Sequence, residues 1–459
     1  MKNKRIVVLL KYFKGELNPF DGAALECALE TGAKEIIALS MAPMSALSTF
    51  QGLTRLGVKG VFISDPLYAG SDTQATSLVL AQAVNRLQPD LVFCGRQSVD
   101  GDTAQVPPML AQRIGFDIKT KAISFNGETI ALRNGERFIP QNKTVVTFEK
   151  IRTLRFPSIF SKLGDVEVWD NQTLGLPKEK CGLSGSPTRV VKSYESSVGR
   201  RTCQFVKMQE LSHLIVEGLN RQCVKQSQET CEKLDEAYYV GNVKTIAENV
   251  AKKAIELNVK DKTAEEIAEE LQRNNTKTVF WEDSDKLKVL ASQVAVLTGA
   301  GICADCISFR VENKQLVMTR PALGGNITAD IVATSDIAFA TVRTVKKEGS
   351  DVIFSVGKGA VDEIESIKQL AEKYDAEVCC SRIVADSGKL PYEKQVGLTG
   401  RTVCPKVYVA FGISGAVQHT CAISGAGTVI AVNVDKQARI FDYADFGIID
   451  DIKNLTIGE

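Results

Sequence analysis

The residues best suited to chemistry in this chain form a segment rich in glycine, hydroxyl and charged groups at positions 95–105. The segment follows an apolar run, residues 90–94, and opens a predicted helix over residues 103–114. In an open α/β sheet, ligands bind at the carboxyl ends of the strands, and a helix N-terminus offers N–H groups to a phosphate. The candidate nucleotide-binding residues are Gly95, Arg96, Gln97, Asp100, Gly101, Asp102, Thr103 and Gln105. A strand–turn–helix corner with an Asp or Thr cap explains the same residues, so both interpretations stay open.

A second polar segment lies at the start of another predicted helix, residues 72–87. Its hydroxyl and carboxylate groups include those of Asp72, Thr73 and Thr76. These groups could bind a nucleotide, or Asp72 or Thr73 could simply cap the helix.

A third group of polar residues borders the apolar runs of the C-terminal part, in segments 381–382, 395–400, 412–419 and 432–435. Because each segment adjoins a predicted strand, all four could gather at one edge of a sheet. The segment from Gly412 leads into a helix, which suits a pyrophosphate. Arg, Thr, Gln and His side chains around a planar redox ligand would donate hydrogen bonds that tune its electronics. His419 taken alone is equally well a helix residue with a satisfied hydrogen bond.

Composition excludes other kinds of site. The 459 residues carry 56 Lys+Arg and 55 Asp+Glu, and this balance gives no support for nucleic acid binding. Two histidines, His213 and His419, are too few for a His-rich metal site, so we expect no metal. Cys303 and Cys306 form a C-x-x-C that precedes a predicted hairpin and lacks a second pair at zinc spacing, which disfavours a redox or zinc role.

The cysteines and the hydropathy pattern indicate the environment of the protein. Twelve cysteines without regular spacing indicate reduced thiols, and we therefore expect a cytoplasmic protein. No stretch approaches the roughly 20 apolar residues of a membrane span, so we expect no membrane insertion.

The predicted elements place these segments on α/β units. Over residues 6–114, short apolar runs alternate with helical stretches, which is typical of a parallel, doubly wound sheet. Residues 120–160 carry the turn signals Asn126-Gly127 and Asn134-Gly135 and predict appended antiparallel strands, the last over residues 144–148. Further α/β units begin near Thr278 and Val352.

In these segments the sequence resembles an electron transfer flavoprotein whose beta and alpha subunits are joined in one chain. Residues 1–200 resemble the beta subunit through Asn18-Pro19-Phe20-Asp21, residues 95–105 and residues 182–188. The remainder resembles a shortened alpha subunit, through segments 319–326, 381–382, 396–400 and 412–419.

The resemblance implies an α/β fold with two doubly wound parallel-sheet, nucleotide-binding-like domains and an α/β FAD-binding domain. The implied division is a beta-like domain with a C-terminal arm over residues 1–200, a shortened alpha N-terminal-like domain over 201–345 and the FAD-binding domain over 346–459.

The resemblance also assigns roles around an FAD in the C-terminal domain. Arg382 should lie over the flavin and favour its anionic reduced states. Thr399 should form a hydrogen bond near N5 of the flavin ring, and His419 should lie near the ring oxygen O2. Ser414, Gly415, Ala416, Val417 and Gln418 should contact the flavin chain and pyrophosphate, with Asn433 and Asp451 at the adenosine end. The other expected FAD contacts are Lys358, Ser381, Gln395, Val396, Gly397 and Leu398.

A second nucleotide is implied for the beta-like part, between Asn18, Asp21 and the segment 95–106. In simple members of the family it is AMP, and in electron-bifurcating members it is a second FAD that takes hydride from NADH. Asp72, Thr73 and Thr76 are similar to the bifurcating type, and we therefore favour a second FAD over AMP. The loop after the first strand, residues 11–17, is shorter than in the family, which leaves NADH binding open.

The implied partners are proteins. Residues 154–163 match the loop by which the family recognises an acyl-CoA dehydrogenase or other flavin dehydrogenase, and ferredoxin or flavodoxin are further candidate acceptors. The alternative is a non-redox adenine-nucleotide-binding module, which would explain the N-terminal unit but not the set of Arg382, Thr399 and His419.

Overall fold

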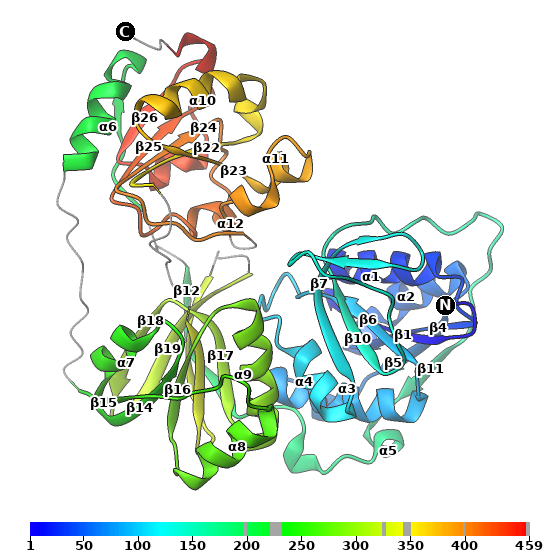
Figure 1. The fold of residues 1–459 in the computed structure, drawn as a ribbon. Coiled ribbons are helices and arrows are strands. Elements are labelled where there is room, and N and C mark those ends of the chain that lie inside the picture. The colour runs from blue at the N-terminus through cyan, green and yellow to red at the C-terminus, as the bar shows by residue number, and fades with distance from the viewer. Residues whose placement is uncertain (196–199, 221–231, 324–326, 343–349, 398–399, 456–459) are drawn as a thin grey trace. The chain divides into compact units, whose positions relative to one another are not determined.

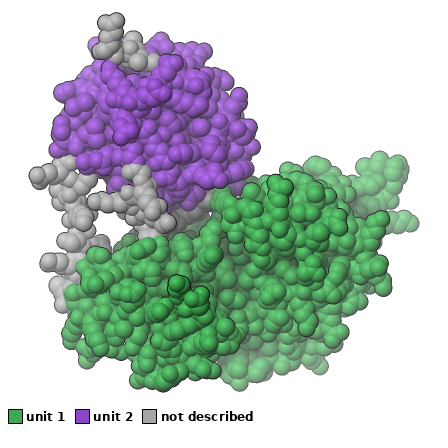
Figure 2. All heavy atoms as spheres, in the orientation of Figure 1, with its two compact units in different colours: residues 1–193, 230–323, 329–343 green, residues 194–229, 324–328, 344–459 purple. Residues whose placement is uncertain are grey.

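The computed structural model describes residues 1–195, 200–220, 232–323, 327–342, 350–397 and 400–455. They form two compact units (Figures 1 and 2). Unit 1 comprises residues 1–193, 230–323 and 329–343, and unit 2 comprises residues 194–229, 324–328 and 344–459. The division of the sequence into three domains stays a prediction.

The N-terminal sheet of unit 1 has nine strands in the order β11-β5-β4-β1-β6-β10-β7-β8-β9. Strands β11 to β7 run parallel, and the short β8 and β9 are antiparallel. The strands are β1 (Arg5–Leu10), β4 (Glu35–Met41), β5 (Lys59–Ile63), β6 (Leu91–Gly95), β7 (Asp117–Phe125), β8 (Ile130–Leu132), β9 (Arg137–Phe138), β10 (Thr144–Phe148) and β11 (Val166–Trp169). The expected parallel, doubly wound sheet is confirmed.

Helices cover both faces of this sheet because alternate residues of each strand point to opposite sides. Ile6 and Val8 of β1 pack in the same core as α1 (Pro19–Glu30) and α2 (Leu47–Gln51). Val7 and Leu9 pack instead with α3 (Thr73–Leu87) and α4 (Val106–Ile114). Because both faces are buried, the central strands read as continuous apolar runs.

The prediction that residues 144–148 form an antiparallel strand is wrong. They form β10, which lies between β6 and β7 and is parallel to both. All five residues are buried, so the strand needs apolar cover on both faces, which a central parallel position supplies. The turn signals at Asn126-Gly127 and Asn134-Gly135 lead only to the antiparallel β8 and β9.

A second, five-stranded parallel sheet in unit 1 has the order β15-β14-β16-β21-β17. Its strands are β14 (Leu234–Val240), β15 (Ala251–Glu256), β16 (Thr278–Glu282), β17 (Gly301–Cys306) and β21 (Ala338–Val342), with helices α7 (Lys244–Val250), α8 (Ala264–Arg273) and α9 (Asp285–Thr298). The side chain of Gln74 links α3 to the end of α9, because its Nε2 donates to the carbonyls of Ala295 on α9 (2.7 Å) and of Ala300 just before β17 (3.0 Å).

A four-stranded sheet has the order β12-β20-β19-β18. Most of its residues belong to unit 1, while residues 194–195 of β12 and 327–328 of β20 belong to unit 2. Its strands are β12 (Thr188–Glu195), β18 (Ser308–Glu312), β19 (Gln315–Ala322) and β20 (Ile327–Ala333). The hairpin expected after the C-x-x-C is confirmed as the antiparallel pair β18 and β19.

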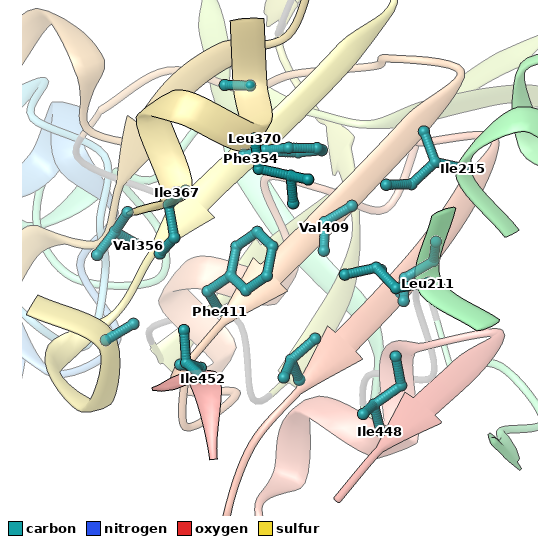
Figure 3. Close-up of a cluster of buried hydrophobic side chains, with 14 of the residues drawn as sticks. Leu211, Ile215, Phe354, Val356, Ile367, Leu370, Val409, Phe411, Ile448 and Ile452 are labelled. Atoms are coloured by element: carbon teal, nitrogen blue, oxygen red, sulfur yellow. The ribbon is translucent and has the colours of Figure 1, made fainter. Parts of the chain in front are cut away.

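Unit 2 is built on a six-stranded parallel sheet in the order β13-β26-β25-β24-β22-β23. The strands are β13 (Gln204–Val206), β22 (Val352–Val356), β23 (Glu377–Cys380), β24 (Val407–Phe411), β25 (Thr428–Val432) and β26 (Phe446–Ile448). Helices α6 (Leu211–Asn220) and α10 (Ile364–Lys373) pack on one face, where Ile215 and Ile367 meet Phe354, Val409 and Phe411 (Figure 3). Residues 204–220 therefore complete both the edge and the core of this unit.

Two further observations concern the whole described chain. Within the described ranges, no helix combines the length and the apolar character that a membrane crossing requires. The cysteines that the structure describes form no disulfide with one another.

Candidate functional site

The carboxyl edge of the unit 2 sheet contains a topological switch point between β22 and β24. The chain runs from β22 to β23 on one side and then to β24 on the other, so the loops after β22 and β24 leave in opposite directions. In open α/β sheets, ligands bind at such a switch point, outside the carboxyl ends of the two strands. The predicted FAD residues Lys358 and Ser414 lie on these two loops.

Backbone contacts between glycines hold the two loops together. Gly357 N donates to Phe411 O (2.8 Å), and Gly359 N donates to Gly412 O (3.1 Å). Gly412 has a φ of +60°, and a Cβ there would lie 2.5 Å from the carbonyl carbon of Gly359. Only glycine satisfies both the left-handed conformation and this close approach.

The segment after Gly412 alternates between buried and exposed residues. Ile413, Gly415, Val417 and His419 are buried, whereas the predicted pyrophosphate contacts Ser414, Ala416 and Gln418 are exposed. The segment ends in the four-residue helix α12 (Val417–Thr420). The exposed side of this loop is therefore available to a ligand.

His419 is buried and neutral at physiological pH. Its Nε2 lies 2.7 Å from the hydroxyl of Tyr408 on β24. Desolvation lowers the pKa of His419 to about 4, although the nearby backbone of Val396 favours the protonated form. Among the described residues, His419 Nδ1 has no hydrogen-bond partner of ordinary geometry.

The carboxyl end of β23 carries Ser381 and Arg382, the latter opening helix α11 (Arg382–Asp386). Arg382 Nε lies 3.4 Å from Asp386 Oδ2. Gln395 and Val396 run alongside this strand end, since Val396 N donates to Cys380 O (2.8 Å) and Gln395 is buried. Gly397 follows and donates from its backbone to Arg401 O (3.1 Å). Leu398 and Thr399 lie outside the described residues.

The loops after β25 and β26 hold the residues predicted for the adenosine end. Asn433 Nδ2 donates to Ile413 O (2.9 Å), and its Oδ1 accepts from Asp435 N (3.0 Å). Asn433 thereby ties the loop after β25 to the loop after β24. Asp451 caps a short 3₁₀ turn by accepting from Lys453 N (3.1 Å). The described predicted FAD residues thus lie at or beside the carboxyl ends of five neighbouring strands.

A second switch point lies between β1 and β6 in the N-terminal sheet. Asp21, near the start of α1, accepts from Gly95 N (2.9 Å) and from Lys11 N (2.8 Å), and so joins the ends of both strands. Burial raises the pKa of Asp21 to about 7 despite these hydrogen bonds. A Cβ on Gly95 would lie 2.6 Å from Phe20 Cβ and closer still to the Asp21 carboxylate, so this position has room only for glycine.

The loop after β6 is ordered by its own polar contacts. Arg96 pairs with Glu149 (3.3 Å) in a buried ion pair, Gln97 Nε2 donates to Asp102 Oδ1 (2.8 Å), and Asn18 Nδ2 donates to Gln97 O (2.9 Å). Lys11 Nζ pairs with Asp100 (2.8 Å). Gly101 and Thr103 are half-buried.

Four buried polar atoms of the segments that follow β1 and β6 have no hydrogen-bond partner among the described residues. They are Tyr12 Oη, Asn18 Oδ1, Arg96 Nε and Gln105 Nε2. Because an unsatisfied buried polar atom costs about 1–3 kcal/mol, such a cluster is expected where a polar ligand completes the hydrogen bonding.

The segment at Asp72 has a structural role. Asp72 Oδ1 caps α3 by accepting from Ala75 N (3.0 Å), which confirms the expected cap. Its Oδ2 accepts from Thr188 N (3.0 Å) and Oγ1 (2.7 Å), which anchors the start of β12. Thr73 Oγ1 donates to Gln105 Oε1 (3.2 Å), and Thr76 lies half-buried in the first turn. A nucleotide role for these three residues stays a prediction.

Sequence reasoning gave no role to Tyr408, which lies beside His419 in unit 2. Tyr408 is a phenol within a fully buried, otherwise apolar strand, and a buried hydroxyl normally has a partner. This polar tip within an apolar run was the available signal. Arg320, within segment 319–326, was not named as a site residue; it is buried on β19, and its Nε and Nη2 have no hydrogen-bond partner in the described structure.

Comparison with known protein families gives two matches. The electron transfer flavoprotein domain matches residues 6–147 and 244–368. The electron transfer flavoprotein FAD-binding domain matches residues 348–424, which contain the loops after β22, β23 and β24.

Individual relatives match the two parts of the chain separately. The electron transfer flavoprotein subunit beta of Thermoanaerobacterium thermosaccharolyticum is 33% identical over 224 residues, covering 44% of this chain and 85% of the relative. The subunit alpha of the same organism is 34% identical over 209 residues, covering 36% of this chain and 63% of the relative. The lactate dehydrogenase (NAD(+),ferredoxin) subunit LctC of Acetobacterium woodii is 33% identical over 211 residues, covering 36% and 50%.

The chain thus spans less than two thirds of the length of these two alpha-type relatives. It matches most of the beta-type relative. With both domain matches and relatives of both subunits in one sequence, the chain belongs to the electron transfer flavoprotein family, as a fusion of beta-type and alpha-type parts that includes the FAD-binding domain.

Proposed function

We propose that this protein is an electron carrier that uses an FAD at the carboxyl edge of the unit 2 sheet to pass electrons between a donor and partner dehydrogenases. The observation that carries the proposal is the convergence of Lys358, Arg382, Ser414 and Asn433 on the edge that contains the switch point. Nδ1 of buried His419 has no hydrogen bond of ordinary geometry among the described residues. Together with the exposed side of the 412–419 loop, it fits a ligand with both carbonyl and phosphate groups.

The residues of this edge would divide the work of holding the cofactor. Bound FAD would supply a group that accepts and releases one or two electrons. Arg382 would place a permanent positive charge near the flavin, since guanidinium remains protonated at all relevant pH values. His419 would offer a hydrogen bond from a neutral imidazole, because desolvation lowers its pKa to about 4. Ser414 and Gln418 would bind the diphosphate from the exposed side of their loop.

Replacing Arg382 with glutamine should lower the reduction potential of the bound flavin. Removing one positive charge near an anionic reduced ring costs about 1–2 kcal/mol at a partly solvated site, or about 40–90 mV for a one-electron step. The measurement is a spectroelectrochemical titration of the purified protein. Lys368→Gln is the control, because Lys368 is a cation of the same unit that pairs with Glu365 on α10. An unchanged potential in Arg382→Gln would show that this guanidinium does not act on the flavin.

We further propose that the crevice between β1 and β6 holds a second adenine nucleotide, in our preferred form a second FAD with NADH as electron donor. The four unpartnered polar atoms around the crevice support a bound polar ligand. The relative LctC is a subunit of a lactate dehydrogenase (NAD(+),ferredoxin), which supports this donor and a ferredoxin-type acceptor. AMP at the same position is the alternative, and it would make the protein a simple one-FAD carrier.

Residues 154–163 provide the surface that we propose for partner dehydrogenases. Phe156, Ile159 and Phe160 are 95%, 84% and 87% exposed, which is unusual for three large apolar side chains in one loop. The loop is nonetheless held by polar anchors, Arg155 to Glu26 (2.8 Å) and Arg55 to Ser158 O (3.0 Å). An anchored loop presents its apolar side chains with little further ordering cost on binding.

Replacing both Phe156 and Phe160 with serine should reduce electron transfer to an acyl-CoA dehydrogenase at least about tenfold in kcat/KM, because buried aromatic anchors dominate interface energetics. FAD content and the free energy of unfolding should not change, since both rings are exposed. Met44→Ser, at another exposed apolar residue of unit 1, is the matched control. Equal rates for the double variant and the wild type would exclude this loop as the docking surface for that partner.

A further inference from the structure

Tyr408 and His419 form a buried hydrogen-bonded pair on the face of the unit 2 sheet opposite α6. Val407, Val409 and Phe411 of β24 pack in the core that contains α6, while Tyr408 and Ala410 face the other core. Tyr408 is 0% exposed and His419 6% exposed. Their 2.7 Å contact joins Tyr408 Oη to His419 Nε2. The titratable groups that act on Tyr408 are the thiols of Cys379 and Cys380 on β23, which β22 separates from β24.

Both partners are neutral, so a single proton lies between them. Burial raises the pKa of Tyr408 well above its ordinary value, and desolvation lowers the pKa of His419 to about 4. Either Tyr408 donates its O–H to Nε2, which places the imidazole proton on Nδ1, or Nε2–H donates to the phenol oxygen. The hydrogen bonds of the surroundings distinguish these two arrangements.

The second arrangement leaves more groups unsatisfied. If Nε2–H were the donor, the Tyr408 O–H would need another acceptor, and Ser355 Oγ beside it makes no hydrogen bond of ordinary geometry in the described structure. The lone pair of Nδ1 would be unsatisfied as well. If Tyr408 is the donor, only the Nδ1–H of His419 lacks a strong partner. The backbone of Val396 beside the ring favours a protonated imidazole, as an acceptor carbonyl would.

We propose that Tyr408 is a positioning residue that fixes His419 as the Nδ1–H tautomer, so that the neutral imidazole presents a hydrogen-bond donor to an acceptor on the bound flavin. The inference rests on the proposed FAD site and adds to it the residue that sets the direction of one hydrogen bond. Tyr408 acts only through His419, whose Nδ1–H has no hydrogen bond of ordinary geometry among the described residues and can therefore donate to a ring carbonyl of FAD.

The tautomer can be read directly, because the chain has two histidines. Long-range ¹H–¹⁵N spectra of the full chain labelled at the imidazole nitrogens, with FAD removed, distinguish protonated from unprotonated Nδ1 and Nε2. His213 is exposed on α6, and His213→Gln removes its signals. We expect His419 to show protonated Nδ1 and unprotonated Nε2 at pH 7. A protonated Nε2 with unprotonated Nδ1, or an averaged mixture, would overturn the proposal.

Tyr408→Phe removes the donor and should release the tautomer. We expect His419 to shift toward protonated Nε2 and FAD to bind about three- to tenfold more weakly, as for loss of one aligned hydrogen bond. Tyr68→Phe is the matched control, because Tyr68 is a buried tyrosine of unit 1 whose hydroxyl donates to Asn171 Oδ1 (2.9 Å). This substitution should alter neither the tautomer of His419 nor the affinity for FAD. Retention of protonated Nδ1 in Tyr408→Phe would overturn the proposal. If this variant does not fold, the wild-type spectrum decides.

The proposed function fails by a different result. Wild-type protein that shows the Nδ1–H tautomer but binds no FAD would contradict the FAD site and leave the role of Tyr408 toward His419 intact.

Discussion

Replacing Gly412 with alanine should destabilise unit 2 by about 3 kcal/mol and remove most of the bound FAD. A left-handed conformation costs a residue with a Cβ about 1–2 kcal/mol, and overpacking against fixed atoms adds about 1–3 kcal/mol. Both apply here, since φ is +60° and the new Cβ would meet the backbone of Gly359 at 2.5 Å and Ala360 N at 2.6 Å. Relief requires the loops after β22 and β24 to separate, which opens the switch point where FAD is proposed to bind.

Gly388→Ala separates the two contributions. Gly388 lies in the same unit with a φ of +72°, but a Cβ there meets nothing within 4 Å. It should therefore cost only the conformational part, about 1–2 kcal/mol, and FAD should be retained. The measurements are denaturant unfolding and FAD content after gel filtration. If Gly412→Ala loses no more stability or FAD than Gly388→Ala, the close approach of the two loops does not support the cofactor.

Unit 1 should lose stability as the pH rises from about 4 through 7, and Asp21 should account for much of this loss. Burial raises the pKa of Asp21 from 3.8 to about 7. The folded state then holds a proton that the unfolded state has released, so stability is fully present below pH 4 and falls as the pH rises through the folded pKa. Full ionisation costs about 4 kcal/mol on this shift. Burial also raises the pKa of Asp283 to about 7, so the wild-type slope has more than one source.

Asp21→Asn isolates the contribution of Asp21. The amide cannot ionise, so the difference in unfolding free energy between pH 5 and pH 8 should shrink by about 3 kcal/mol. The variant should also lose about 1–3 kcal/mol of unfolding free energy at every pH, because asparagine has only one acceptor oxygen for the N–H groups of Gly95 and Lys11. Asp170→Asn, which removes a carboxylate from the N-cap of a short surface helix but keeps a capping oxygen, is the control and should leave the slope between pH 5 and pH 8 unchanged. The same slope in Asp21→Asn and wild type would contradict a raised pKa at this carboxylate.

Local sequence signals predicted the elements better than their pairing. The cap at Asp72 and the helix from Thr73 depend on neighbouring residues, and both were correct. The placement of β10 was wrong, because whether residues 144–148 return to the centre of the sheet depends on partners at Leu91 and Asp117, far away in sequence. Register between distant strands is decided by burial on both faces, which a short apolar run alone does not specify.

The candidate site was predictable to the extent that it lies on strand ends. Glycines after apolar runs, such as Gly357 and Gly412, mark close backbone approaches, and the structure places them at one switch point. The partner of Tyr408 was not predictable, because nothing in the local sequence distinguishes His419 from any other group that could bond a buried phenol. Asn433 was assigned to the adenosine end, while its amide in the structure also ties two loops together.

Release and quantification of the nucleotides from the purified protein, with FAD present during purification, tests the central claim most directly. The account predicts two FAD per chain, one for each switch point. One FAD with one AMP would still support an electron carrier, but it would show that AMP and not a second FAD occupies the N-terminal site. Protein that contains no flavin under these conditions would contradict the assignment of the unit 2 edge as an FAD site and with it the proposed electron transfer.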